Sequence, residues 1–176
     1  MKILILFYSH TGNTEKVAQT IKESLIDEYA NINVETKKIE KLENLDLSKY
    51  DLVFFGSGIY ASRVSSDLVN LLEKVTYFPK NSAYFCTHAS LDLYQKPFTK
   101  INEILEENDS NVLGLFECVG ENLGISQERQ LKMLDRLSVK EKEKALETKK
   151  LIKGRPNQDD LQKAKRFALD MISKLV

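Results

Sequence analysis

Net charge, cysteine and long apolar stretches are all scarce in this sequence. Lysine and arginine together number 26, and so do aspartate and glutamate, so the formal net charge at pH 7 is zero. Proteins that hold nucleic acid by its phosphates carry a surplus of basic residues, so neutrality argues against a nucleic-acid partner. The chain also lacks the acidic surplus that steers a protein onto basic partners.

The two cysteines exclude several kinds of site. Cys86 and Cys118 both lie inside apolar runs, and no CxxC pair or Cys/His cluster suggests a metal ion. Both are therefore predicted to be buried, reduced thiols. We expect a protein without a bound metal.

The apolar runs are too short for a membrane protein. None approaches the ~20 residues needed to span a bilayer. The first run, residues 3–8, is followed by polar residues and not by a small-residue cleavage site, so it predicts a strand and not a signal peptide. We expect a cytoplasmic protein without a membrane span.

The remaining composition is that of a globular domain. The chain has 176 residues, 42% of them hydrophobic and 30% charged, enough for one domain over the whole length. Continuous apolar runs are typical of strands buried on both faces, and an alternating run is typical of an edge strand with one exposed face. The predicted strands are residues 3–8, 33–38, 52–55, 83–87 and 112–119.

Helical patterns separate these runs. Val17, Ile21 and Leu25 recur every four residues, which places them on one helical face, and similar stripes precede the fourth and fifth strands. Alternating strands and helices predict an α/β fold with a parallel sheet and right-handed crossovers. Five strands fit the doubly wound order 2-1-3-4-5.

A helical insertion is predicted after the fifth strand, at about residues 120–154. It is longer than an ordinary connection, and it carries a leucine stripe. Ser138 followed by Glu141 has the form of a capping box, and Gly154 ends the helix. Asn157 then caps a last helix.

Residues 9–14, Ser-His-Thr-Gly-Asn-Thr, are the strongest functional signal, since they lie between a predicted strand and a predicted helix. Hydroxyls, an amide and backbone N–H groups at a helix N-terminus can surround a phosphate, and Gly12 allows close approach. The loop lacks the lysine of a Walker A motif and the glycines of a dinucleotide fingerprint. It suits one terminal phosphate; the alternative is a helix cap with incidental hydroxyls. The candidate phosphate-binding residues are Ser9, His10, Thr11, Gly12, Asn13 and Thr14.

These residues resemble the phosphate-binding loop of flavodoxins, a family that holds FMN. Residues 56–60 are similar to the second flavin loop of that family, and residues 87–94 fall where the third loop belongs. Residues 154–161 are similar to those of a group of bacterial and archaeal flavodoxin-family proteins. The resemblance implies a flavodoxin-like three-layer fold with FMN as cofactor. The further cofactor-binding residues it implies are Ser57, Gly58, Ile59, Tyr60, Thr87, His88, Ala89 and Tyr94.

The order of the strands agrees with this resemblance. The three loops follow neighbouring strands, so they are expected to converge on one crevice at the carboxyl ends. Tyr60 would lay its ring on the flavin, unless it is a plain surface tyrosine. Tyr94 would cover the other face, with Leu91 or His88 as alternatives. His10 would donate to the phosphate and His88 to the flavin edge, or relay a proton; the alternative for each is a solvated loop histidine.

Three functions remain open from the sequence. The first is a flavodoxin-type FMN protein that transfers electrons between redox partner proteins. The second is a flavin-dependent oxidoreductase acting on a small-molecule electron acceptor, such as the quinone reductases, FMN reductases and protoporphyrinogen dehydrogenases that share this fold; the insertion would then be a lid over a substrate pocket. A flavin-free binding module is the third reading, and a phosphoacceptor receiver is rejected because Ser9 and His10 stand where it needs an acidic pair.

Overall fold

The computed structural model describes residues 1–39, 45–91 and 97–176. Its parallel sheet has the order β2-β1-β3-β5-β6, which confirms the predicted order 2-1-3-4-5, because β5 and β6 are the fourth and fifth parallel strands. A two-residue strand, β4, pairs antiparallel with the end of β3. The strands are β1 (Lys2–Tyr8), β2 (Asn33–Lys38), β3 (Leu52–Tyr60), β4 (Arg63–Val64), β5 (Asn81–His88) and β6 (Asn111–Val119).

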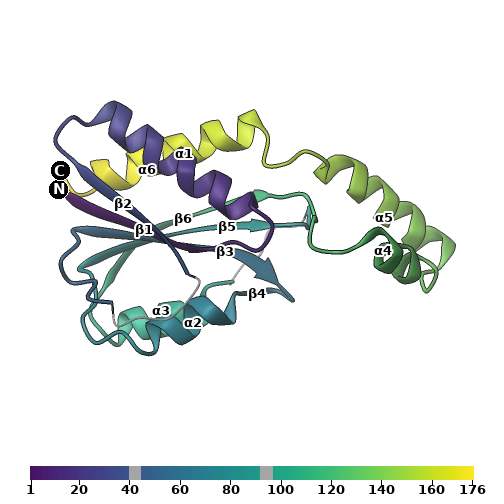
Figure 1. Cartoon of the computed structure of the whole chain (residues 1–176), viewed down its shortest axis with the longest axis horizontal. Helices are drawn as coiled ribbons and strands as arrows, with labels where there is room; N and C mark the ends of the chain where they lie inside the picture. Colours follow the sequence, from purple (N-terminus) through teal and green to yellow (C-terminus); the bar gives the residue numbers. More distant parts are fainter. Residues whose placement is uncertain (40–44, 92–96) are drawn as a thin grey trace.

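Helices cover both faces of the sheet and complete three layers (Figure 1). On one face lie α1 (Asn13–Glu28) and α6 (Gln158–Ser173), and on the other α2 (Ser66–Leu72) and α3 (Thr99–Glu106). Alternate side chains of each central strand enter one of two cores, which is why these strands have continuous apolar sequences. Of the described helices, none is both long and apolar enough to cross a membrane.

Strand β3 is longer than predicted. The sequence suggested an end at residue 55, before Gly56, but the strand continues through Tyr60. A Cβ on Gly56 would lie 2.1 Å from the ring of Phe85 on β5, so glycine is required here by close packing inside the sheet, and it does not end the strand. Residues Ala61 and Ser62, with φ of 48° and 65°, then make the two-residue turn into β4.

The predicted insertion is a helical arm. It consists of α4 (Gln127–Leu134) and α5 (Val139–Ile152), which project from the carboxyl end of the sheet, opposite the two chain termini (Figure 1). The predicted capping box at Ser138 and Glu141 is present, and Asn157 caps α6 as expected. The structure therefore confirms the helical character of this segment.

Both cysteines are buried and free, as predicted. Burial raises the pKa of the Cys86 thiol, and it raises the pKa of Cys118 to about 12. Both side chains are therefore neutral thiols at physiological pH, and they act as small apolar residues of the sheet.

Candidate functional site

Four connections enclose a cavity of about 340 Å³ at the carboxyl end of the sheet. This volume lies within the ~300–1,000 Å³ range of small-molecule sites. Three of the connections, after β1, β3 and β5, are those singled out from the sequence; the fourth, residues 120–125 after β6, was missed. The predicted residues that line the cavity are His10, Thr11, Asn13, Thr14, Gly58, Ile59, Tyr60, Thr87, His88 and Ala89.

Ser9 and Gly12 shape the loop after β1 and do not line the cavity. The Ser9 hydroxyl accepts hydrogen bonds from the N–H groups of Gly12 (3.2 Å) and Glu15 (3.3 Å), so it closes the first turn of α1. Gly12 has φ of 90°, a left-handed conformation that favours glycine. These bonds show how Ser9 holds the loop in shape, and its role toward a phosphate stays a prediction.

The loop after β1 and the start of α1 supply neutral hydrogen-bond donors to the cavity. The backbone N–H groups of Asn13 and Thr14, the first residues of α1, have no hydrogen-bond partner among the described residues, and the positive end of the helix dipole lies beside them. The side chains of His10 and Thr11 line the same cavity, whose described lining contains neither lysine nor arginine. This arrangement is the uncharged cradle expected for a single phosphate.

A hydroxyl pair joins α1 to β5. Thr14 and Thr87 are both buried, and their Oγ1 atoms lie 2.9 Å apart. One hydroxyl hydrogen is used within the pair, so the other remains available to a ligand. The pair also fixes the first turn of α1 against the sheet.

The segment after β6 is the wall that sequence reasoning missed. The Asn13 amide donates to the backbone carbonyl of Glu121 (2.8 Å), and the N–H of Gly120 donates to the carbonyl of His88 (2.8 Å). A Cβ on Gly120 would lie 2.6 Å from Asn13 Nδ2, and one on Gly124 would lie 3.3 Å from Thr11 Cγ2. Gly120 and Gly124 were the features of the sequence that could have identified this wall. They could not be interpreted from the sequence alone, because the reason for glycine at both positions is the close approach of the loop after β1.

Tyr60 forms another wall. It is 41% exposed, and its ring lies edge-on to that of Tyr8, with centroids 6.0 Å apart. Burial raises the pKa of the Tyr60 phenol, and a backbone hydrogen bond from His10 only partly opposes this. The phenol is therefore neutral at physiological pH, with its ring available to an aromatic ligand.

Two predicted residues lie elsewhere. Ser57 is fully buried; its hydroxyl donates to the carbonyl of Gly58 (2.6 Å) and accepts from the N–H of Ser65 (2.9 Å), so it holds β3 against the start of α2. Its side chain is turned inward because β3 continues past the expected end. Tyr94 lies outside the described residues.

The family model for the flavodoxin domain matches residues 4–169. The chain belongs to the flavodoxin family. It is 31% identical to an uncharacterised protein of Methanocaldococcus jannaschii, over 98% of this chain and 99% of that one. Among solved structures it is similar to oxidised flavodoxin 2 of Bacillus cereus (22% identity, TM-score 0.63, 99% of each chain). It is also similar to a flavoprotein of Lactobacillus acidophilus solved in complex with FMN (22% identity, TM-score 0.53, 66% of this chain and 92% of that one).

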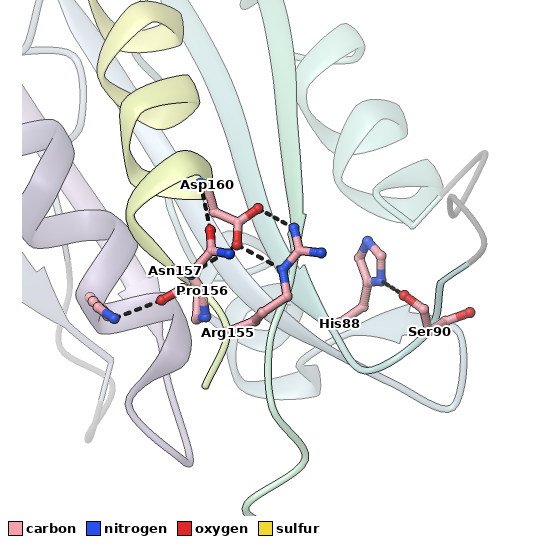
Figure 2. Close-up of polar contacts among 7 residues, drawn as sticks. His88, Ser90, Arg155, Pro156, Asn157 and Asp160 are labelled. Carbon is pink, nitrogen blue, oxygen red and sulfur yellow. Dashed lines mark hydrogen bonds and ion pairs between the residues drawn. The ribbon is translucent and has the colours of Figure 1, made fainter. Parts of the chain in front are cut away.

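In this flavodoxin, His88 is a buried residue beside the cavity, so the reading of a solvated loop histidine is wrong for it. Its Nδ1 lies 3.0 Å from the carbonyl oxygen of Ser90 (Figure 2), which fits a neutral ring with the proton on Nδ1. Burial lowers the pKa of His88, and Arg155 adds to this effect. The Glu117 carboxylate, 3.9 Å from Nε2, and the bond to Ser90 oppose it.

Residues 154–157, the segment before α6, form a clamp with Asp160 of α6 and Lys16 of α1 (Figure 2). The guanidinium of Arg155 binds both carboxylate oxygens of Asp160, which is 1% exposed and also accepts from the N–H of Asn157 (2.9 Å). Burial acts to raise the pKa of Asp160, but these hydrogen bonds outweigh it and lower the pKa. Lys16 of α1 donates to the carbonyl of Pro156 (2.6 Å), which ties the segment to the body.

Glu121, which lines the cavity, is hydrogen-bonded to two residues of the clamp. The N–H of Glu121 donates to the carbonyl of Arg155 (2.8 Å), and its carboxylate accepts from the N–H of Gly154 (2.7 Å). The two ends of the insertion are therefore joined beside the cavity. These contacts give a structural role to Gly154 and Arg155, which belong to the segment 154–161 singled out from the sequence.

Proposed function

We propose that this flavodoxin binds FMN in the 340 Å³ cavity and transfers electrons through it. The observation that carries the proposal is the neutral donor set that the start of α1 supplies to a cavity that Tyr60 walls. FMN has one terminal phosphate and one aromatic ring system, and the cavity offers a counterpart for each. The likeness in fold to a flavoprotein solved with FMN supports the assignment.

The chain's own residues then have distinct tasks. The N–H groups of Asn13 and Thr14, with the side chains of His10, Thr11 and Thr14, bind the phosphate. Tyr60 packs its ring on the isoalloxazine, and Ala89 lines the cavity wall next to His88. The bound flavin supplies the redox chemistry, while the protein positions it and tunes its electronics.

The test compares FMN with riboflavin, which lacks the phosphate. In the double variant Thr11→Ala/Thr14→Ala, FMN binding is expected to weaken about tenfold or more, because charge-assisted hydrogen bonds to phosphate are lost. Riboflavin binding is expected to change little. Binding is followed by the shift of the flavin absorption bands.

The matched control is Thr20→Ala, a threonine on the same helix whose hydroxyl bonds within α1. This variant is expected to bind FMN and riboflavin as tightly as the unaltered protein does. Equal losses for FMN and riboflavin in the double variant would show that this loop is not the phosphate site. Failure of the unaltered protein to bind FMN would overturn the proposed function.

Stepwise anaerobic reduction of the loaded protein then separates the two open roles. Reduction in two resolved one-electron steps supports a carrier between redox proteins. Reduction in a single two-electron step supports an oxidoreductase acting on a small molecule.

A further inference from the structure

A second, larger cavity of about 570 Å³ lies between α4, α5 and the segment after β6. Its volume is again that of a small-molecule site. Most of its surface comes from aliphatic and thioether side chains. Those that the argument uses are Ile125, Met133, Leu134, Leu137, Leu146 and Ile152.

The arm does not fill this groove with its own side chains. Helix α4, all of whose residues are described, buries none of them, and α5 buries only Ile152. Met133 and Leu146 are 51% and 43% exposed although both line the groove. In a globular protein, a pair of helices ordinarily packs its apolar stripe against a neighbouring element. An apolar stripe that stays exposed therefore marks a binding surface.

The groove adjoins the flavin cavity. Ala89, Glu121, Asn122 and Ile125 line both. A molecule in the groove would therefore lie next to a flavin in the adjoining cavity, so the groove is placed for a compound that exchanges electrons with it.

The basic surplus of the arm as a whole favours an anionic occupant, whereas the groove lining itself holds two glutamates and two lysines. Residues 126–153 contain nine lysines and arginines but five aspartates and glutamates, so the arm carries +4 and the rest of the neutral chain −4. The carboxylates of Glu121 and Glu141, in the groove lining, already accept backbone N–H groups of Gly154 and Ser138. No described acidic residue pairs with the lining lysines.

These two lysines are Lys144 and Lys149. Lys144 forms no ion pair or side-chain hydrogen bond with any described residue, and Lys149 donates to the neutral amide oxygen of Gln130 (2.8 Å). Their charges are therefore available to a ligand, at the edge of an apolar surface.

We propose that the groove binds a small redox-active compound with an apolar body and an anionic group, held against the flavin cavity by the arm. This inference rests on the proposed function, because only a flavin in the adjoining cavity gives such a compound an electron partner. The apolar body would pack on Leu134, Leu137 and Ile152, and the anion would pair with Lys144 or Lys149.

The first experiment is equilibrium dialysis with anthraquinone-2-sulfonate and with neutral 2-(hydroxymethyl)anthraquinone, using the protein with and without FMN. The sulfonate is expected to bind more tightly in both forms. The difference in affinity between the two probes is expected to become smaller as the salt concentration is raised, because exposed charges are screened. Binding that disappears when FMN saturates the protein would place the probe in the flavin cavity and overturn the proposal.

Matched leucines on α4 test the apolar half of the site. Leu134→Asn is expected to weaken binding of both probes about tenfold, because an apolar contact surface is replaced by a polar one. Leu131→Asn is the control, since Leu131 is exposed on the same helix and does not line the groove. Both variants should bind FMN as the unaltered protein does, which shows that they fold.

Matched lysines on α5 test the anionic half. The double variant Lys144→Gln/Lys149→Gln is expected to weaken sulfonate binding about two- to fivefold, in keeping with partly exposed ion pairs, without changing binding of the neutral probe. Lys140→Gln/Lys150→Gln removes two charges from the same helix outside the groove lining, and is expected to change neither.

The outcomes separate this inference from the proposed function. FMN binding with equal probe affinities in Leu134→Asn and Leu131→Asn overturns the groove site alone. Absence of FMN binding overturns the function and this inference with it. Sedimentation that shows a dimer, lost in Leu134→Asn, would mean that a second copy covers the groove, and would also overturn the inference.

Discussion

The body of this flavodoxin and its helical arm are built by different means. In the body, α1 and α6 bury apolar faces against a sheet that is itself covered on both sides (Figure 1). In the arm, α4 buries no side chain, and strong caps, such as Ser138 with Glu141, define where the helices begin. The body is therefore held by long-range packing, and the arm by local hydrogen bonds and its clamped base.

Charge follows the same division, since the arm carries +4 and the remainder −4. A neutral total had argued against electrostatic recognition, but the asymmetry shows that only the sum is neutral. Net charge is a weak guide when opposite charges are gathered in different parts of a fold.

The largest effect is expected at the clamp where body and arm meet. Asp160→Ala should reduce the free energy of unfolding by about 3 kcal/mol, because it leaves the Arg155 guanidinium without its buried partner and the N–H of Asn157 without its capping-box acceptor. Urea denaturation measures the change. Asp159→Ala, an exposed carboxylate in the same helical turn, should change it by less than about 0.5 kcal/mol.

A smaller effect, confined to a pH range, is expected at His88. Because its pKa is lowered in the folded protein, the unfolded chain binds a proton more readily below pH 6.5. Stability contributed by neutral His88 is thus present above that pH and is lost as the pH falls through the folded pKa. Denaturation across this range should show a decline in the unaltered protein that is absent in His88→Gln.

His10→Gln is the matched control, since His10 is the chain's other histidine and is exposed. The His10→Gln variant should show the same decline in the free energy of unfolding below pH 6.5 as the unaltered protein. A decline of the same size in both variants would mean that burial of His88 does not control it.

A local effect of about 1 kcal/mol is expected in the arm alone. Ser138→Ala removes the cap of α5, so amide hydrogen exchange in α5 should become about fivefold faster. Exchange in α1 should not change, because α1 is held by packing with the sheet. Faster exchange in both helices would show that body and arm unfold together.

The smallest effect is expected at the turn after β3. Ala61 has φ of 48°, which strains any residue with a Cβ, so Ala61→Gly should raise the free energy of unfolding by about 0.5 kcal/mol. Thermal unfolding measures it. The opposite change, a local loss of about 1 kcal/mol, is expected for Ala145→Gly within helix α5, and amide hydrogen exchange in that helix measures it. A stabilisation in both variants would contradict the assignment of strain to the turn.

Much of the fold was predictable because its signals are local or periodic. Continuous apolar runs located the central strands, and the capping boxes at Ser138 and Asn157 marked helix starts. The length of β3 was not predictable, because the requirement for Gly56 comes from Phe85 on another strand. The sequence raised the insertion as a lid over a substrate pocket, but it did not predict an open groove between α4 and α5, since the leucine stripe of the arm looks the same whether or not something packs on it.

The sequence by itself determined that a neutral, hydroxyl-rich loop joins a buried strand to a helix. Only the tertiary structure decided which of its groups face the cavity: the Ser9 hydroxyl accepts N–H groups of Gly12 and Glu15 within the loop, while Thr11 lines the cavity wall. Asn13 binds a carbonyl 108 positions away, at Glu121. Periodicity and caps act within a few residues of the chain, whereas a site at the end of a sheet is assembled from segments that meet only when the chain has closed.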